Sequence, residues 1–534
     1  MKANQQTLSS WIVLAALSLP LVLTSCVDDS VENAPELISD IIVSGIEERY
    51  TATAYVGEVL EISPEVQSGY SESELHYRWM LLDGNTGSPD INGDTIRPVL
   101  IGEDKHLNYE VNTTPGTYQL RLEVSADNGY SIVRTASLSI VTAFSQGFYI
   151  LKETAEGNTD LDLVNTSGEL LSDVLAQTQG SSLQGTPLKL NVLYAGYYIN
   201  PDKDEMETTH HLVVTTEKGT IGMYRTTDLL ETFSRRNIKY EAMEADEKPY
   251  TVVQTNMGYG VLLTNHGIYH ASTGAGWTSS KSSGRYGYPE AETGASGYVF
   301  VDLNSYGCLA FWDEDSHSLY CTNYNLVVQP LADINLGGTE QTQNLTTYEC
   351  LNCGLCTGSG VGHFILRDNA TGTRYLYLTA GDFANGLYYT GCKALGENSH
   401  AARSTAYATC GLQGNYIYCV DGNKLYGINL NSETLAEVLM PLAGIDSRET
   451  ITMVTNQYWS SYFIEQNNYD YLMVGTQQGN NYRLYMYNMK GGVPDGEPVA
   501  TYSGTGKIKA VRFVSQEYDS NDAGFNNALS PCWD

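Results

Sequence analysis

The sequence predicts an all-β protein in which a small immunoglobulin-like sandwich precedes a β-propeller. The first observation is composition: the 534 residues include 40 Tyr and 51 Gly, and Tyr suits half-buried strands while Gly suits turns. The second is that short alternating runs recur between turn signals over residues 37–142. The third is a degenerate repeat over residues 145–534. We expect seven blades, with six or eight as alternatives.

Charge narrows the function classes. The chain has 29 Lys and Arg against 62 Asp and Glu, a formal net charge of −33. A nucleic-acid-binding surface needs a basic patch, so no nucleic-acid partner is expected. Only 17% of the residues are charged and 42% are hydrophobic, which excludes a disordered acidic chain.

Residues 1–25 have the features of an export signal. Lys2 is the only charged residue before the apolar stretch Trp11–Leu23, which is too short for a comfortable membrane span. The stretch ends in Leu23-Thr24-Ser25-Cys26, which resembles the lipobox of bacterial lipoproteins. The resemblance implies cleavage before Cys26 and lipidation of its thiol. Several acyl chains on one Cys give stable anchoring.

Residues 26–36 read as the lipidated Cys and a tether. The acidic pair in Val27-Asp28-Asp29-Ser30 resembles the surface-export signal of Bacteroidota lipoproteins. This resemblance implies an outer-membrane protein exposed on the cell surface. We expect it to contact the membrane through its lipid anchor only.

Residues 37–142 are expected to form the sandwich. His76–Met80 alternates, which predicts that Trp79 points into the core, and Pro115–Tyr118 is followed by the period-two strand Gln119–Val124. These segments resemble the PKD (polycystic kidney disease) module, an Ig-like spacer or binding domain of surface proteins. The resemblance implies that the hydroxyl of Tyr118 bonds the backbone at a corner.

The repeat over residues 145–534 consists of a strand, a polar turn, and an apolar residue followed by Tyr. Its copies end at Tyr224, Tyr269, Tyr320, Tyr388, Tyr426 and Tyr485. The steps of 45, 51, 68, 38 and 59 residues are close to propeller periods. We expect Phe148–Leu151 to begin the first blade and the strand near Lys507–Phe513 to pair with it, closing the ring and removing its exposed edges.

Nine cysteines follow Cys26, and export would place them where disulfides persist. Cys410 and Cys419 are centred on the turn Gly414-Asn415, and Cys308 and Cys321 on Glu314-Asp315, so each pair is expected to form a cross-strand disulfide. A further motif has the spacing of metal ligands but lacks the rest of the ferredoxin pattern; for it we favour disulfides over metal, with Cys392 and Cys532 as possible partners. Its members are Cys350, Cys353 and Cys356.

The chain carries no recognised catalytic or nucleotide-binding motif, so no catalytic residue, cofactor or metal is assigned. His266 and His270 have metal-like spacing, but Asn265-His266-Gly267 reads as a turn, so the two imidazoles should diverge. Aromatic residues outside the repeat hairpins are candidate ligand contacts in loops, with packing between blades as the alternative. These candidates are Tyr286, Tyr288, Tyr458, Trp459 and Tyr462.

Taken together, these features resemble the PKD-like-family lipoproteins of Bacteroidota, which are often associated with SusC/SusD-type nutrient transporters. The resemblance implies a non-catalytic accessory subunit that binds or presents a glycan or peptide to such a transporter complex. Two alternatives stay open: a sialidase-like or lyase-like propeller enzyme acting on glycans, and an adhesin or scaffold.

Overall fold

The computed structural model describes most of the chain between residues 40 and 515. The exceptions inside that range are 55–56, 84–85, 88–94, 96, 201–204, 256–258, 273–282, 288, 290, 292, 303–304, 306, 324, 333–343, 383 and 460–468. The described part is almost entirely strand and turn, with three short helices: η1 (Glu72–Glu74), α1 (Val174–Gln179) and α2 (His400–Arg403). None of the helices in this part is long and apolar enough to cross a membrane.

The N-terminal unit is a β-sandwich. Its main sheet has the strand order β2-β9-β8-β5-β6, and two-stranded sheets β1-β4 and β3-β7 accompany it. The pairs are antiparallel except β2 with β9, which is parallel. The strands are β1 (Ile41–Ser44), β2 (Arg49–Thr53), β3 (Val59–Ile62), β4 (Glu65–Ser68), β5 (Leu75–Leu82), β6 (Val99–Gly102), β7 (Leu107–Glu110), β8 (Gly116–Ala126) and β9 (Ser131–Val141).

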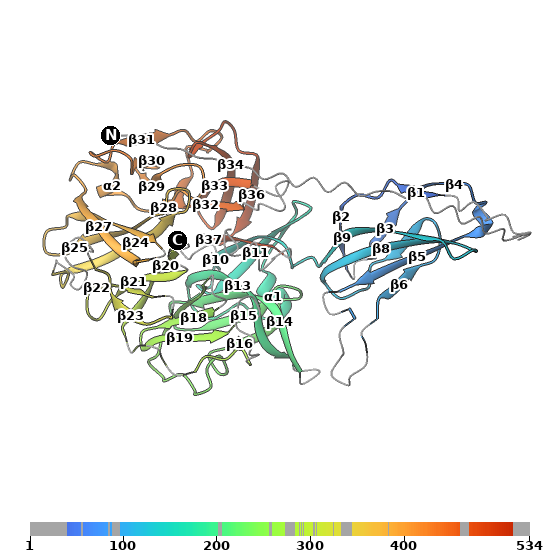
Figure 1. The fold of residues 1–534 in the computed structure, drawn as a ribbon. Helices are drawn as coiled ribbons and strands as arrows, with labels where there is room; N and C mark the ends of the chain where they lie inside the picture. Colours follow the sequence, from blue (N-terminus) through green and yellow to red (C-terminus); the bar gives the residue numbers. More distant parts are fainter. Residues whose placement is uncertain are drawn as a thin grey trace, which may run out of the picture.

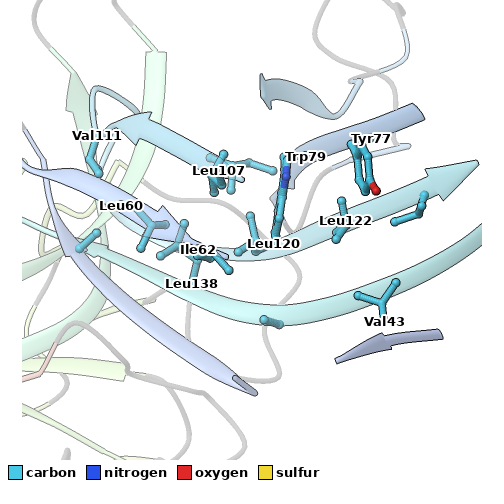
Figure 2. Packing of buried hydrophobic residues seen from close by; sticks show 14 of the residues in the cluster. Val43, Leu60, Ile62, Tyr77, Trp79, Leu107, Val111, Leu120, Leu122 and Leu138 are labelled. Carbon is cyan, nitrogen blue, oxygen red and sulfur yellow. The ribbon is translucent and has the colours of Figure 1, made fainter. Parts of the chain in front are cut away.

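The sandwich core forms around Trp79, which is fully buried against Leu120 and Leu122 of β8 (Figure 2). Its indole N–H donates to the carbonyl of Asp104 at 3.0 Å, so the one polar atom of the ring is satisfied. The Tyr118 hydroxyl donates to the carbonyl of Thr114 at 2.7 Å. Both expectations from the sequence, the inward Trp and the backbone-bonded Tyr, are confirmed.

The C-terminal unit is a seven-bladed propeller in the residues that the structure describes (Figure 1). The first blade takes its innermost strand from the end of the chain, with the order β37-β10-β11-β12, and the third blade has three strands plus the bridge Ile268–Ala291. The blades in ring order contain β37 (Lys507–Val514), β10 (Gly147–Glu153), β11 (Thr159–Asn165) and β12 (Leu170–Leu171); β13 (Pro187–Asn200), β14 (Glu205–Thr216), β15 (Ile221–Arg225) and β16 (Glu231–Ser234); β17 (Pro249–Gln254), β18 (Tyr259–Thr264) and β19 (Gly267–Ser272); β20 (Ala295–Asp302), β21 (Cys308–Asp313), β22 (Ser318–Thr322) and β23 (Val328–Pro330); β24 (Tyr348–Cys356), β25 (Val361–Asp368), β26 (Arg374–Asp382) and β27 (Gly386–Ala394); β28 (Tyr407–Thr409), β29 (Tyr416–Asp421), β30 (Lys424–Asn429) and β31 (Glu437–Met440); β32 (Thr450–Trp459), β33 (Tyr469–Gln478), β34 (Asn481–Lys490), β35 (Val493–Pro494) and β36 (Ala500–Thr505).

The ring closes by antiparallel pairing of β10 with β37, in which Phe148 faces Phe513 and Ile150 faces Val511. The innermost strands contact one another in the order β37, β13, β17, β20, β24, β28, β32 and back to β37. The predicted pairing of the first and last strands of the ring is therefore confirmed. Closure pairs the edge of β10 that would otherwise be exposed and leaves only short, protected edges at the centre of the ring.

The repeat predicted from the sequence corresponds to the hairpin of the second and third strands in five blades. In the fifth blade the prediction is one strand out of register, because Tyr388 lies in the fourth strand, β27. The equivalent residue is Tyr377, which follows Leu376 in the third strand, β26, and is buried. Counting to Tyr377 instead of Tyr388 shortens the step from Tyr320 from 68 to 57 residues. The step therefore contains no additional blade.

Buried carboxylates connect the inter-blade links to the blades they precede. Glu247 accepts from the hydroxyl of Thr264 at 3.1 Å in the third blade. Glu449 accepts from Thr476 at 2.6 Å and from Tyr485 at 2.9 Å in the seventh. The Thr is the last residue of the second strand in the third blade and lies two residues before the end of that strand in the seventh, so a similar side-chain contact recurs in both. These carboxylates serve the architecture of the ring.

Candidate functional site

The two faces of the propeller carry different connections. In a blade of antiparallel strands, the turn between the second and third strands and the link to the next blade lie at the same end. The other two turns lie at the opposite end. Thr142, which follows the sandwich, donates its hydroxyl to the carbonyl of Thr227 at 2.7 Å, and Thr227 lies in the turn from β15 to β16. The sandwich is therefore joined to the face of the third-to-fourth-strand turns.

Three grooves lie along the links and turns of the blades, and their lining residues place all of them on the face opposite that junction. The groove between the third and fourth blades has a volume of about 550 Å³. Its polar lining comes from the link and turns of those two blades. This polar lining includes His266, Thr293, Asp313, Asp315 and Ser316.

One wall of this groove is fixed by Asp313, which is 3% exposed. Its carboxylate accepts from the backbone N–H of Gly294 at 3.0 Å and of Ser316 at 2.8 Å. Gly294 is required here because a Cβ atom would lie 2.4 Å from the side chain of Asp315. The turn of the fourth blade is thus tied to the preceding link, and the backbone N–H of Asp315 is bonded to Asp313 beside the groove.

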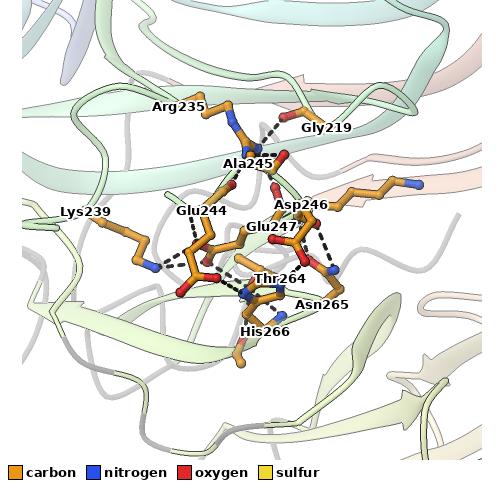
Figure 3. Close-up of polar contacts among 12 residues, drawn as sticks. Gly219, Arg235, Lys239, Glu244, Ala245, Asp246, Glu247, Thr264, Asn265 and His266 are labelled. Carbon is orange, nitrogen blue, oxygen red and sulfur yellow. Dashed lines mark hydrogen bonds and ion pairs between the residues drawn. The ribbon is translucent and has the colours of Figure 1, made fainter. Parts of the chain in front are cut away.

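The link between the second and third blades contributes a second ordered element next to His266 (Figure 3). Arg235 donates to the carbonyls of Gly219, Glu244, Ala245 and Glu247. One guanidinium therefore holds three carbonyls of residues 244–247 and one carbonyl of the second blade. The backbone of this link is accordingly determined by hydrogen bonds rather than by exposed side chains.

The buried side chain of Glu247 holds the same link against the third blade through hydrogen bonds and an ion pair. Burial disfavours its ionised form, but the ammonium of Lys239 at 2.9 Å, together with the hydroxyl of Thr264, outweighs burial and lowers the pKa of Glu247. The ordering of residues 244–247 therefore depends on the carboxylate of Glu247, which is ionised and paired with Lys239.

Two acidic side chains of the same link flank one imidazole. His266 Nδ1 lies 3.7 Å from Glu244 Oε2, and Nε2 lies 3.5 Å from Asp246 Oδ2. The side chains of Glu244 and Asp246 are 74% and 80% exposed, whereas that of His266 is 26% exposed. Figure 3 shows the three groups together at the edge of the link. We name Glu244, Asp246 and His266 the link triad.

The groove and the link triad together form an acidic, hydrogen-bond-accepting surface. Carboxylates accept hydrogen bonds from hydroxyl and ammonium groups. Asp315 and the triad carboxylates would repel a polyanion, and the net charge of −33 acts in the same direction over longer range. The surface therefore fits a neutral polyhydroxyl ligand or a cationic one.

The two predicted hairpin disulfides are absent, and the register gives the reason. The four-residue turn Glu314–His317 makes Cys321 face Ala310, two residues from Cys308. In the other hairpin Cys419 faces Tyr407, while the N–H of Cys410 bonds the carbonyl of Tyr416. The odd shift of three residues puts Cys410 and Cys419 in different core clusters, on opposite faces of the sheet.

The cysteines of the C-x-x-C-x-x-C motif all lie in the inner strand β24. A bulge between Cys350 and Asn352 allows Cys350 and Cys353 to enter the same core cluster. Burial raises the pKa of Cys350 and of Cys356, so their reactive thiolate forms are disfavoured. No disulfide joins the eight cysteines that the structure describes, so none links the motif cysteines to one another or to Cys392. Cys532, the other possible partner, lies outside the described residues.

Two of the predicted ligand-binding tyrosines are core residues. Tyr286 is fully buried in the cluster of the second and third blades. Tyr458 is 4% exposed and bonds the hydroxyl of Thr357. Burial raises the pKa of both phenols. The expectation that these two side chains are exposed in loops is wrong, and packing between blades, the alternative, accounts for them.

The side chains of the other predicted site residues lie outside the described part of the chain. Trp459 ends β32, and its side chain is outside the described set. Tyr288, Tyr462, Cys26 and Cys532 lie outside the described residues. Lipidation of Cys26 stays a prediction from the sequence.

The sequence analysis did not find the link triad because it considered His266 only as a partner of His270, and the predicted turn should make those two imidazoles diverge. The turn assigned to Asn265-His266-Gly267 is confirmed, since β18 ends at Thr264 and β19 begins at Gly267. The missed signal is the acidic run Glu244-Ala245-Asp246-Glu247. Its position in the link that precedes the histidine's own blade brings it beside His266.

Comparison with protein families identifies the N-terminal region. Residues 26–187 match the model of the PKD-like family, so the chain carries a PKD-like domain, as the sequence predicts. The match extends past the sandwich and into the first strands of the propeller. No curated protein matches the chain.

Solved structures give distant similarities. An auxiliary nutrient binding protein from Bacteroides thetaiotaomicron is 8% identical, with a TM-score of 0.32 over 82% of this chain and 96% of that one. A protein of unknown function from the same organism is 12% identical, with a TM-score of 0.28 over 83% and 96%. Dihydro-heme d1 dehydrogenase NirN is 9% identical, with a TM-score of 0.37 over 72% and 77%. At TM-scores below 0.5, these similarities carry no information about ligands or partners.

Proposed function

We propose that the protein is a lipid-anchored, cell-surface binding subunit that captures a glycan or peptide for a SusC/SusD-type transporter. In this proposal the lipid on Cys26 and residues 27–36 attach the chain to the outer membrane. The PKD-like sandwich acts as a spacer, and the propeller binds. No catalytic step is assigned to it.

The observation that carries the proposal is the orientation of the propeller on its spacer. The junction at Thr142 and Thr227 occupies one face, and the groove lined by His266 and Asp315 opens on the other. In this proposal the membrane anchor lies on the side of the junction, so the groove opens away from the membrane. Such an arrangement suits capture of a ligand from the medium.

The chemistry of the groove defines the ligand class. A neutral oligosaccharide or a basic peptide offers hydroxyl or ammonium donors to Asp315 and the link triad. A sulfated or uronate-rich glycan is repelled by the same carboxylates and by the net charge of −33. Among immobilised oligomers, we expect the neutral or basic ones to retain the protein and the polyanionic ones not to.

Co-purification tests the proposal directly. The protein is tagged in its native host, extracted in mild detergent, and its partners are identified by mass spectrometry. We expect stoichiometric recovery of the two components of a SusC/SusD-type transporter, the SusC-type channel protein and its SusD-type lipoprotein. Loss of both partners from a Cys26→Ala variant, which cannot be lipidated, is the matched control. Recovery of the lipidated protein alone contradicts the assembly.

A further inference from the structure

Histidine–carboxylate contacts of two lengths occur among the described residues. His76 Nε2 meets Asp127 at 2.7 Å, and His400 Nδ1 meets Asp421 at 2.7 Å. These are ordinary hydrogen bonds. In the link triad the corresponding distances are 3.5 and 3.7 Å, beyond hydrogen-bond length. The imidazole of His266 thus lies between two carboxylates without bonding either.

We propose that the link triad is a binding site for a divalent first-row transition ion, with Zn²⁺ as the reference metal. One imidazole nitrogen and one oxygen from each of Glu244 and Asp246 lie within 4.8 Å of one another. Two ligands of a tetrahedral zinc ion, each about 2.1 Å from it, are about 3.4 Å apart. The 3.5 Å between His266 Nε2 and Asp246 Oδ2 already matches that spacing.

The donor set decides which cation fits. Ca²⁺ and Mg²⁺ prefer oxygen ligands throughout, whereas imidazole together with carboxylate suits Zn²⁺ and its neighbours. Three protein ligands leave at least one coordination position open. Because His266 also lines the 550 Å³ groove, we infer that the open position faces that groove.

Two structural features favour this assignment over an accidental gathering of surface charges. Arg235 donates to the backbone carbonyls of Glu244 and of Ala245, the residue between the two acidic ones. Asn265, next to the histidine, donates to the carbonyl of Asp246 at 3.1 Å. The link and the histidine turn are therefore held together before any ion arrives, which lowers the ordering cost of binding.

Titration with Zn²⁺ alone tests the site on the full-length protein. Isothermal titration calorimetry is expected to show saturable binding of one ion per chain. The variants His266→Gln and Glu244→Gln/Asp246→Asn are each expected to bind at least tenfold more weakly. Glu244 and Asp246 are exposed and His266 is partly exposed, and the thermal unfolding midpoints of the variants without metal establish that they fold.

The matched control is His76→Gln, which removes an exposed histidine that is already hydrogen-bonded to a carboxylate. It is expected to bind zinc like the parent. Zinc binding that persists unchanged in both triad variants, or no saturable binding by the parent, overturns the site. This inference goes beyond the proposed function, because its readout is the metal alone and does not involve the transporter or the captured ligand.

Discussion

Replacing Lys152 by Met is expected to lower the free energy of unfolding of the propeller by about 3–5 kcal/mol. Lys152 on β10 is 1% exposed, and its ammonium lies 2.6 Å from Asp162 and 2.9 Å from Asp173. Burial disfavours the charged lysine, but the two carboxylates outweigh burial and raise its pKa. Without the ammonium, the fully buried carboxylate of Asp162 loses its counter-charge.

The same cluster joins the first blade to the last. Tyr482 of β34 donates its hydroxyl to Asp162 at 2.5 Å, across the point where the ring closes. Damage at Lys152 is therefore expected to reach the seam between the blades as well as the interior of the first one. Amide hydrogen exchange in β10 and β37, alongside chemical denaturation, measures both effects.

A matched control is available on the neighbouring strand. Lys507 of β37 pairs with Glu153 of β10 at 2.8 Å, but its side chain is 59% exposed. Exposed pairs of this kind contribute about 0–1 kcal/mol, so Lys507→Met is expected to cost far less. Equal destabilisation by the two substitutions would show that the buried cluster does not stabilise closure.

Acid is expected to weaken the propeller well before its carboxylates titrate. His211 and His363 are fully buried, and burial lowers the pKa of each from 6.5 to about 3. Below pH 6.5 these two histidines bind protons in the unfolded chain but stay neutral in the folded chain. The stabilisation is complete above pH 6.5 and is lost as the pH falls toward 3. At pH 5 each histidine lowers the free energy of unfolding by roughly 2 kcal/mol relative to pH 8.

His211→Phe isolates one of these contributions. Both ring nitrogens of His211 lack a hydrogen-bond partner among the described residues, and its ring lies among Tyr198 and Phe233. An apolar ring removes the cost of burying the imidazole, about 1 kcal/mol at pH 8, and the additional cost of roughly 2 kcal/mol at pH 5. Urea unfolding at both pH values measures the difference. A variant whose stability relative to the parent does not change with pH contradicts this assignment.

The sequence predicted the architecture because its signals are periodic and redundant. Alternation around Trp79 and the recurring hairpin with its apolar–Tyr pair each reflect a backbone geometry that many residues specify together. One copy of the repeat was misplaced by a strand. In the fifth blade, Leu376-Tyr377 and Leu387-Tyr388 both satisfy the same pattern, and only the pairing of β25 with β26 distinguishes them.

The details of the site were less predictable because they depend on single residues. The cysteine pairs required an exact hairpin register, and a turn of four residues in place of two separates Cys308 from Cys321. The burial of Tyr286 depends on residues 238–240, far away in sequence, against which its backbone pairs. The link triad combines residues from a link and a turn about twenty positions apart, and the hydrogen bonds of Arg235 that order it have no local signature.

Closure by β37 also bears on how the chain is made. The innermost strand of the first blade is the last strand of the ring to leave the ribosome, so every shorter nascent chain presents β10 with one edge unpaired. An unpaired edge is a template for aggregation and a target for chaperones and proteases. Every chain interrupted before residue 507, whatever its length, lacks the backbone pairing between residues 147–153 and 507–514 that the finished protein has. A chaperone or protease that recognises the unpaired edge of β10 therefore distinguishes incomplete chains from complete ones by this one feature.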